Sequence, residues 1–504
     1  MQLAPKRSLV LLDLYAMVAL VLLAGTVMIL WSHVGHEMIP VHGGIGYDGT
    51  LYSKITRDPM GTVFGGTLDV HRVQRVVPSL AVYAMLRPFH VHDANPAIVL
   101  GFQVMNYALM VACAFVWWLI ARRLDLSRAA GWVGFFALLI NYGLIKFQAY
   151  SPVMTDTFGF FLGLVVLACV VFKRPGLLPW VAVVGAFTWP TVTYSALGLY
   201  IFSRPGGPLR PNRWWGVAVA GIAAISIPAF AVYTYRCGRT EVCSSTLMYD
   251  SVVPGLMPFS VVFLAVFIYL AFRPVVELLT VPAVLRALDW RRLLVAVVLM
   301  LLIARVQHDL ADPSFRTVGR TLYNTALGGI AKPGGFLVAH AVYYGPALLL
   351  LAVTWRRAVR GIQQFGAGFV ALLLGFLLIA LTNEARILMN EWPMFALMAA
   401  IVVDKLEWGK FEAAMFGLLA LVTSRVWFPV NHGPYIGDWR KYPDQYYGMS
   451  MGLKQTVFSY ALMGFGCLVC AGILYWLVHR KRPSVEQGAD ELPAPDDAVR
   501  HPVG

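Results

Sequence analysis

Long apolar runs, separated by short polar loops, fill most of this chain. The first run covers residues 9–31, which is long enough to cross a bilayer because a spanning helix needs about 20 apolar residues. Hydrophobic residues make up 59% of the chain and charged residues only 13%, whereas soluble domains carry about 25% charged residues. In the hydrocarbon layer, the backbone N–H and C=O groups of a helix form hydrogen bonds within that same helix. We therefore predict an all-α polytopic membrane protein with roughly 12–14 transmembrane or re-entrant helices.

The other apolar runs define the domain organisation. No small-residue cleavage site follows the first run, so we expect a retained anchor rather than a signal peptide. We expect one membrane domain at 9–480, preceded by a cytoplasmic N-terminus at 1–8 and followed by a polar, disordered cytoplasmic tail at 481–504. The further apolar runs are 97–120, 129–148, 157–172, 177–202, 214–236, 256–272, 293–306, 335–354, 364–382, 391–403, 411–428 and 455–478.

The basic residues indicate which loops face the cytoplasm. They give the chain a net charge of +14 and gather in short loops, as the positive-inside rule describes. No nucleic-acid-binding motif accompanies them, so we expect no nucleic-acid partner. The basic loops are 121–128, 172–175, 203–213, 286–292, 355–360 and 479–482. The loops expected on the opposite side are 32–75, 306–334 and 428–454.

Two segments decide between alternative topologies. The arrangement above requires 76–89 to be a re-entrant or oblique helix, and 177–202 to be a hairpin of two half-helices broken at Trp189-Pro190. In the alternative both segments are full spans, which would place two of the basic loops outside. The charge bias favours the first arrangement.

The loop at 32–75 is unusually polar for a segment between two apolar runs. Charge next to a bilayer is costly, so a concentration of it usually marks a functional site. We therefore interpret this loop as the catalytic face of a membrane enzyme. Its charged residues and histidines are Glu37, Asp48, Asp58, Asp69, Lys54, Arg57, Arg72, Arg75, His33, His36, His42 and His71.

Asp48 lies in the glycine-rich sequence GYDGTLYSKITRDP. The glycines allow a tight turn into a short helix, on which Leu51, Tyr52 and Ile55 would share a face with Asp48. Such a helix would lie at the membrane surface with its apolar side down and Asp48 at its N-terminus, where the helix dipole favours an ionised carboxylate. Asp48 is then a candidate general base that accepts a proton from a hydroxyl. The alternative role is that of a helix N-cap.

Arg72 and Arg75 are three residues apart in DVHRVQRVVP, which predicts neighbours on one helix that leads towards the membrane. Two guanidinium groups at the bilayer surface suit a phosphate, which each can bind through two hydrogen bonds. The alternative is that both anchor the helix to lipid headgroups. Asp69 is expected to pair with one of them.

Later loops contain further polar candidates. Asp156 opens an apolar run after a proline-containing turn, as a site residue or as an N-cap. Glu384 and Arg386 lie between two apolar runs on the predicted outer side, where Arg386 either reaches a lipid-linked phosphate or extends along its helix end to the interface. The loop 428–454 is rich in aromatic residues, which stack on sugar rings or form an interfacial belt.

The histidines and cysteines give weaker signals. His33, His36 and Glu37 are close in sequence, but their spacing matches no established zinc pattern. We therefore expect them to be structural, with no metal and no cofactor. Cys237 and Cys243 flank a polar loop and would form a disulfide only if that loop faces an oxidising compartment.

These motifs together resemble the GT-C superfamily of integral-membrane glycosyltransferases. The resemblance rests on YDG-x-x-Y after the first span (Asp48, Tyr52), on R-x-x-R-x-x-P (Arg72, Arg75), on TD after a proline-containing turn, and on E-x-R near the later spans. It is closest to bacterial members that form cell-surface glycopolymers, and more distantly to PIG-V-like mannosyltransferases. The residues of those two elements are Thr155, Asp156, Glu384 and Arg386.

The resemblance implies a function and its partners. The family uses polyprenyl-phosphate sugars as donors and carries its catalytic acid in the first outer loop, which corresponds to Asp48 here. Arg72, Arg75 and Arg386 would bind the donor phosphate, and Asp156 would line the site. No adjacent acidic pair accompanies Asp48, which argues against a catalytic metal.

We therefore expect an inverting transferase in the bacterial inner (plasma) membrane, acting in cell-envelope glycopolymer biosynthesis. It would move a hexosyl or pentosyl group from a polyprenyl-phosphate donor to a glycan or glycolipid hydroxyl on the outer face, with membrane lipids around it. One alternative is a glycopolymer polymerase or ligase with its chemistry in a late loop. Another is a lipid-linked sugar transporter, which would need ionisable residues inside its spans.

Overall fold

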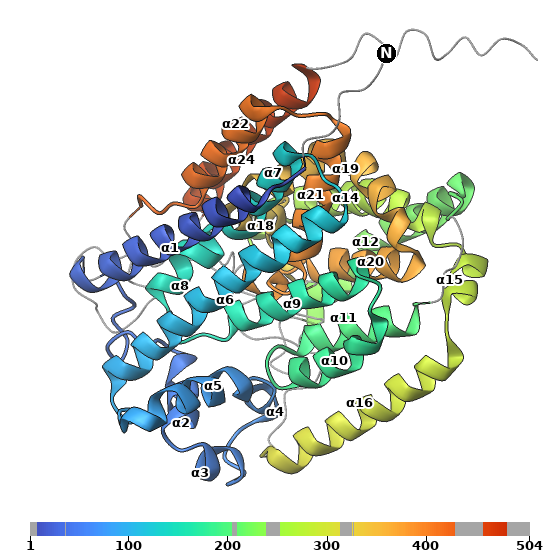
Figure 1. The fold of residues 1–504 in the computed structure, drawn as a ribbon. Helices are drawn as coiled ribbons and strands as arrows, with labels where there is room; N and C mark the ends of the chain where they lie inside the picture. Colours follow the sequence, from blue (N-terminus) through green and yellow to red (C-terminus); the bar gives the residue numbers. More distant parts are fainter. Residues whose placement is uncertain are drawn as a thin grey trace, which may run out of the picture.

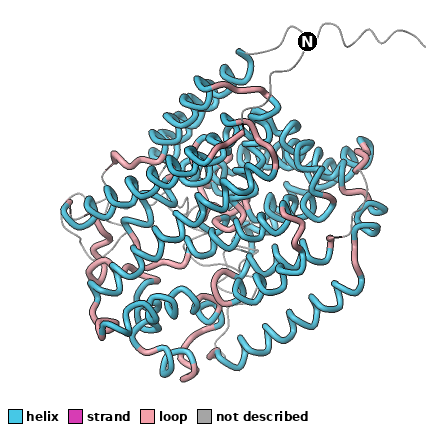
Figure 2. Tube along the Cα trace, viewed as in Figure 1, coloured by secondary structure: helices cyan, strands magenta, loops and turns pink. Residues whose placement is uncertain are grey.

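The computed structural model describes residues 8–35, 37–203, 209–237, 252–312, 325, 327–428 and 457–480. Helices and the loops between them make up this part of the chain, and two isolated backbone bridges are its only β-structure (Figure 2). The predicted loop 428–454, the tail 481–504 and most of the N-terminus 1–8 lie outside the described residues. So does the predicted Cys237–Cys243 disulfide.

Six of the described helices are long and apolar enough to cross a membrane, and a bent pair supplies a seventh candidate. The bent pair is α7 (Arg128–Leu139) with the π-helical turn η2 (Tyr142–Lys146) and α8 (Phe147–Tyr150), which meet at 48°. The described residues therefore form an all-helical, multi-pass membrane protein. The six long helices are α1 (Leu11–Val34), α6 (Asn95–Arg123), α12 (Arg213–Cys237), α14 (Met257–Leu278), α16 (Trp290–Leu310) and α24 (Val457–Arg480).

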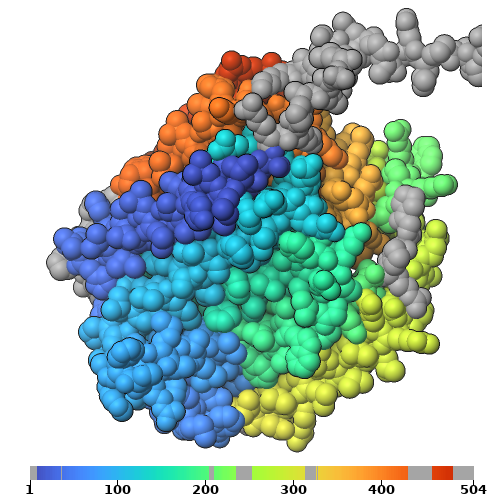
Figure 3. Space-filling model, in the orientation of Figure 1, coloured from blue at the N-terminus to red at the C-terminus, as the bar shows by residue number. Residues whose placement is uncertain are grey.

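The long helices differ in how much protein covers them. In α12 and α16 only 17% of the apolar span is buried, whereas in α6 the share is 56%. Figure 1 shows α6 between α1 and α9, and Figure 3 shows α1 and α16 at the surface of the molecule. The apolar residues that these outer helices expose are suited to contact lipid, since apolar surface in water would be unfavourable.

Shorter helices fill the interior. Nearly every residue of α21 (Trp392–Lys405) is buried, where it packs against α7, α9 and α19. A helix that is apolar all round belongs inside a large protein or a membrane. The other short helices are α9 (Asp156–Val171), α18 (Gly335–Tyr344), α19 (Pro346–Ile362), α20 (Ala367–Ile379) and α22 (Lys410–Thr423), whereas α15 (Val281–Ala287) lies at the surface.

Two predicted runs are broken into shorter helices. The run 177–202 becomes α10 (Leu178–Ala186) and α11 (Pro190–Ile201), which pack against each other across a break that ends at Trp189. The run 335–354, predicted as one segment, is divided between α18 and α19 at Gly345. Gly345 has φ +79°, a conformation favoured by glycine, and Pro346 supplies no backbone N–H to continue the first helix.

The first polar loop forms a layer of short helices on one side of the bundle, at the lower left of Figure 1. They are α2 (Gly49–Arg57), α3 (Pro59–Val63), α4 (Val70–Val73) and α5 (Val76–Leu86), followed by η1 (Arg87–Phe89). The apolar face of α2 does not lie down on lipid as predicted. Tyr52 and Ile55 are buried inside the protein, where α2 packs against α5.

At the opposite end of α1, Asp13 connects the first helix to α7. Its Oδ1 accepts hydrogen bonds from Arg128 Nε at 2.7 Å and from Trp132 Nε1 at 2.9 Å. Its Oδ2 accepts the backbone N–H of Val10 at 2.9 Å. This intramembrane acid therefore has structural partners and does not indicate a transport path.

Candidate functional site

The turn before α2 places Asp48 next to the loop at 151–155, which joins α8 to α9. Gly46 has φ +78°, and a Cβ atom there would lie 3.3 Å from Ser151 Oγ, so the two loops are in close contact. The backbone N–H of Ile39 also donates to the carbonyl of Tyr150 at 2.8 Å. Asp48 precedes the first residue of α2, but its side chain makes no capping hydrogen bond. The N-cap alternative therefore holds for its backbone position and not for its carboxylate.

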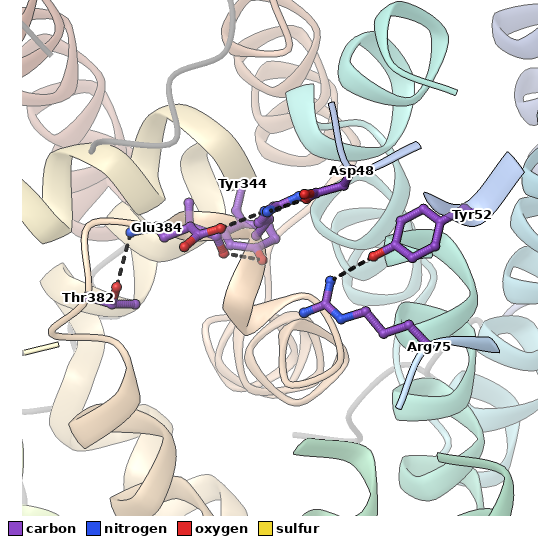
Figure 4. Close-up of polar contacts among 8 residues, drawn as sticks. Asp48, Tyr52, Arg75, Tyr344, Thr382 and Glu384 are labelled. Atoms are coloured by element: carbon purple, nitrogen blue, oxygen red, sulfur yellow. Dashed lines mark hydrogen bonds and ion pairs between the residues drawn. The ribbon is translucent and has the colours of Figure 1, made fainter. Parts of the chain in front are cut away.

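Asp48 and Glu384 share one guanidinium group, that of Arg386. Arg386 Nη2 donates to Asp48 Oδ2 at 3.0 Å, and Arg386 Nε donates to Glu384 Oε1 at 2.6 Å. Figure 4 shows Asp48 and Glu384 pointing towards each other with these contacts between them. The side chain of Arg386 is 16% exposed and that of Asp48 is 43% exposed. Arg386 thus points into the site and does not extend away along a helix end.

The backbone around Arg386 is held by α18. Arg386 belongs to η6 (Ala385–Leu388), and Tyr344 donates its hydroxyl to the carbonyl of Ala385 at 2.8 Å. The Tyr344 ring stacks on Trp392, with the ring centres 4.2 Å apart. Thr382 Oγ1 accepts the backbone N–H of Glu384 at 3.2 Å (Figure 4). These contacts fix the direction from which Arg386 approaches Asp48.

Arg75 is the second cation of the site. It is buried, and its Nη1 makes a long hydrogen bond of 3.5 Å to the Tyr52 hydroxyl (Figure 4). Its Cζ lies 4.2 Å from the ring centre of Trp189. A guanidinium over an indole face is stabilised by the cation–π interaction. Among the described residues, Arg75 Nε has no hydrogen-bond partner, so donor capacity remains.

Arg72 does not join this group, and the prediction of one helix carrying both arginines is wrong. Asp69 caps α4 and forms an ion pair with Arg72. The helix ends at Val73, and Arg75 adopts a non-helical conformation with φ −137° before α5 begins. Arg72 therefore lies within α4 and Arg75 outside it, so the two side chains do not share a helix face. The expected alternative for Asp69, pairing with Arg75, does not occur.

Asp156 is a third acid near Arg386, after Asp48 and Glu384. It is the first residue of α9 and is fully buried, and neither carboxylate oxygen has a hydrogen-bond partner within the described part of the chain. It does not act as an N-cap. Its electrostatic interactions are with Arg386, Arg75, Asp48 and Glu384.

The charges of the site determine the protonation of Asp48. Burial disfavours the carboxylate, but Arg386, with smaller effects from Arg75 and His71, lowers the pKa of Asp48 below its ordinary value. Burial also works against the charged form of Arg386, yet Glu384 and Asp48 raise its pKa. Asp48 is therefore ionised at neutral pH, as the base of a proton-transfer step must be.

The predicted histidine cluster is dispersed. His33 Nε2 hydrogen-bonds Gln103 Oε1 at 2.9 Å, while Glu37 accepts from Lys146 Nζ at 2.6 Å and from Trp31. Within the described ranges, which omit His36, there is no group of three side chains that could hold a metal ion.

Sequence reasoning missed Lys146, Trp189 and Tyr343. Lys146 had a signal, because it is an ionisable residue inside an apolar run and such residues are usually paired or functional. Trp189 contacts Arg75, and Tyr343 interacts electrostatically with Asp156 and Arg386. The sequence marks Trp189 only as the residue before a helix break at Pro190, and Tyr343 does not differ from its neighbours, so only the fold reveals these contacts.

Comparison with known proteins gives no match. No protein-family model matches the chain, and neither does any curated protein or solved structure. The function must therefore be argued from the site itself.

Proposed function

We propose that this protein is a membrane glycosyltransferase of the GT-C type. It moves a sugar from a polyprenyl-phosphate donor to a hydroxyl of a glycan or glycolipid acceptor, with inversion, on the outer face of a bacterial plasma membrane. One observation carries the proposal: a partly exposed carboxylate, Asp48, lies 3.0 Å from a guanidinium nitrogen of Arg386, in a site that Arg75 also reaches electrostatically. A base next to cations suits a reaction in which a hydroxyl loses a proton and a phosphate leaves.

The residues act on two sides of the anomeric carbon. Asp48 accepts the proton of the acceptor hydroxyl as the acceptor oxygen forms its bond to that carbon. The bond from the carbon to the lipid-phosphate oxygen breaks, and the phosphate leaves with the bonding electron pair. Negative charge develops on that oxygen, where Arg386 and Arg75 stabilise it.

The resting contacts make donor binding and base activation interdependent. Arg386 donates to Asp48 and Glu384 through separate nitrogens, and a carboxylate held by an arginine is a weak base. A donor phosphate that attracts the Arg386 side chain weakens its contact with Asp48. The base then gains proton affinity when the donor is in place. In this proposal the guanidinium groups of Arg386 and Arg75 supply positive charge to the leaving phosphate.

A transfer assay tests the proposal. Full-length protein in proteoliposomes is given polyprenyl-phosphate-linked radiolabelled mannose, glucose or arabinose together with cell-envelope glycan acceptors. We expect transfer by the wild type and a loss of about 100-fold or more for Asp48→Asn. The matched control is Asp69→Asn, which keeps a helix-capping side chain outside the site and should retain transfer. Normal activity of Asp48→Asn contradicts the proposal, and activity lost only on changes within 437–447 favours a polymerase or ligase.

A further inference from the structure

Three buried side chains on η2, α9 and α18 carry polar atoms without hydrogen-bond partners within the described part of the chain. Both carboxylate oxygens of Asp156 and the hydroxyls of Tyr343 and Tyr142 lack partners among the described residues. The three side chains are at most 1% exposed. Buried polar groups are normally hydrogen-bonded, because leaving them unpaired costs free energy, so an exception indicates a place for a polar ligand.

The two tyrosines are held in position by packing. Their rings meet edge to face with centres 5.8 Å apart. Gly143 lies against the Tyr343 ring so closely that a Cβ there would be 2.3 Å from Cε1. Arg425 lies over the Tyr142 ring at 3.8 Å. Neither ring is free to turn, so the direction of each hydroxyl is set by the fold.

Tyr343 lies on α18, which packs against both η2, the turn that carries Tyr142, and η6, the turn that carries Arg386. It interacts electrostatically with Asp156, Arg386 and Glu384, and its neighbour Tyr344 holds the backbone that carries Arg386. The unpaired groups therefore lie beside the position proposed for the donor phosphate. Whatever they bind is attached to that phosphate or adjacent to it.

We propose that Asp156 and Tyr343, extended by Tyr142, form a subsite that binds the hydroxyl groups of the transferred sugar. The inference rests on the proposed function and adds to it the residues that recognise the sugar. A carboxylate without donors needs a ligand with several hydroxyl groups, each of which donates and accepts, and a tyrosine hydroxyl does both in return. A sugar ring on the donor phosphate meets this requirement, whereas the bare lipid phosphate does not.

Competition binding tests the subsite separately from catalysis. Radiolabelled undecaprenyl phosphate is bound to the full-length protein in nanodiscs and displaced by the unlabelled lipid, or by the same lipid carrying mannose, glucose, galactose or arabinose. We expect at least one sugar lipid to bind about tenfold more tightly than undecaprenyl phosphate. Tyr343→Phe should remove this difference and leave the affinity for undecaprenyl phosphate unchanged, and Asp156→Asn should also remove the difference between the lipids.

Two controls make the outcomes distinct. Tyr107→Phe removes another buried, unpaired tyrosine hydroxyl, on a ring that packs against Gly25 of α1, and should keep the sugar preference. Arg386→Gln should weaken both ligands equally. The subsite alone is overturned if both Tyr343→Phe and Asp156→Asn retain the preference for a sugar lipid, or if the wild type shows no such preference. Either result is expected if water molecules satisfy these polar groups. Failure of the wild type to bind undecaprenyl phosphate overturns the proposed function as well.

Discussion

Arg386 and Asp48, which are 338 residues apart in sequence, form an ion pair with a nitrogen–oxygen distance of 3.0 Å. The same guanidinium holds Glu384 at 2.6 Å. The pair joins the first polar loop to the loop before α21, so changes in either loop should affect the other. Four predictions follow from this and from the neighbouring contacts.

The first concerns pH. The pKa of Asp48 is lowered below 3.8 in the folded protein. Its ion pair therefore contributes stability at every pH above the pKa that Asp48 has in the unfolded chain. That contribution to stability is lost only as the pH falls through the lower pKa that Asp48 has in the folded protein. We expect Asp48→Asn to lower the midpoint temperature of unfolding in detergent. The decrease should be constant from neutral pH down to about 3.8, the ordinary pKa of an aspartate. The control is Asp93→Asn, an exposed acid. A difference that disappears well above 3.8 would show that the pair is not formed.

The second prediction separates the two arginines of the first loop. Arg75→Gln should weaken binding of undecaprenyl phosphate about tenfold or more, because a hydrogen bond to a charged group is lost. Arg72→Gln should change it by less than about twofold, since Arg72 is paired with Asp69. Both affinities are measured in nanodiscs with radiolabelled lipid. Equal effects of the two variants would argue against the assignment of Arg75.

The third prediction concerns Asp13, which joins α1 to α7. Asp13→Ala leaves the donors on Arg128, Trp132 and the Val10 backbone without their acceptor. We expect a loss of about 2 kcal/mol of stability, moderated by the exposure of Arg128 to solvent. Thermal unfolding in detergent measures it, with Asp93→Ala as an exposed control that should change little. An unaltered midpoint would mean that these hydrogen bonds add nothing to stability.

The fourth prediction concerns the buried pair of Lys146 and Glu37. Lys146→Met leaves Glu37 as a buried charge with its main cation gone, and we expect a loss of about 3 kcal/mol. The double variant Lys146→Met, Glu37→Gln should be more stable than Lys146→Met alone, because the unpaired charge is removed with its partner. Thermal unfolding of both variants decides this. A double variant less stable than the single one is the contrary result.

The class of this protein is readable from its apolar runs, because crossing a bilayer depends on local composition and length. The polar first loop and the candidates Asp48, Arg75, Asp156 and Arg386 are readable for the same reason, since charge next to long apolar runs stands out along the chain. The separation of Arg72 from Arg75 is not, because α4 ends at Val73 and Arg75 adopts a non-helical conformation before α5 begins.

Only the tertiary structure decided which of these residues meet. Periodicity describes neighbours within a few turns of helix, whereas the pairing of Asp48 with Arg386 depends on how the first polar loop packs against the loop before α21. The same holds for Glu37 with Lys146, and for the packing of Tyr343 against Tyr142. Such contacts arise from packing summed over the whole bundle, which no local pattern in the sequence records.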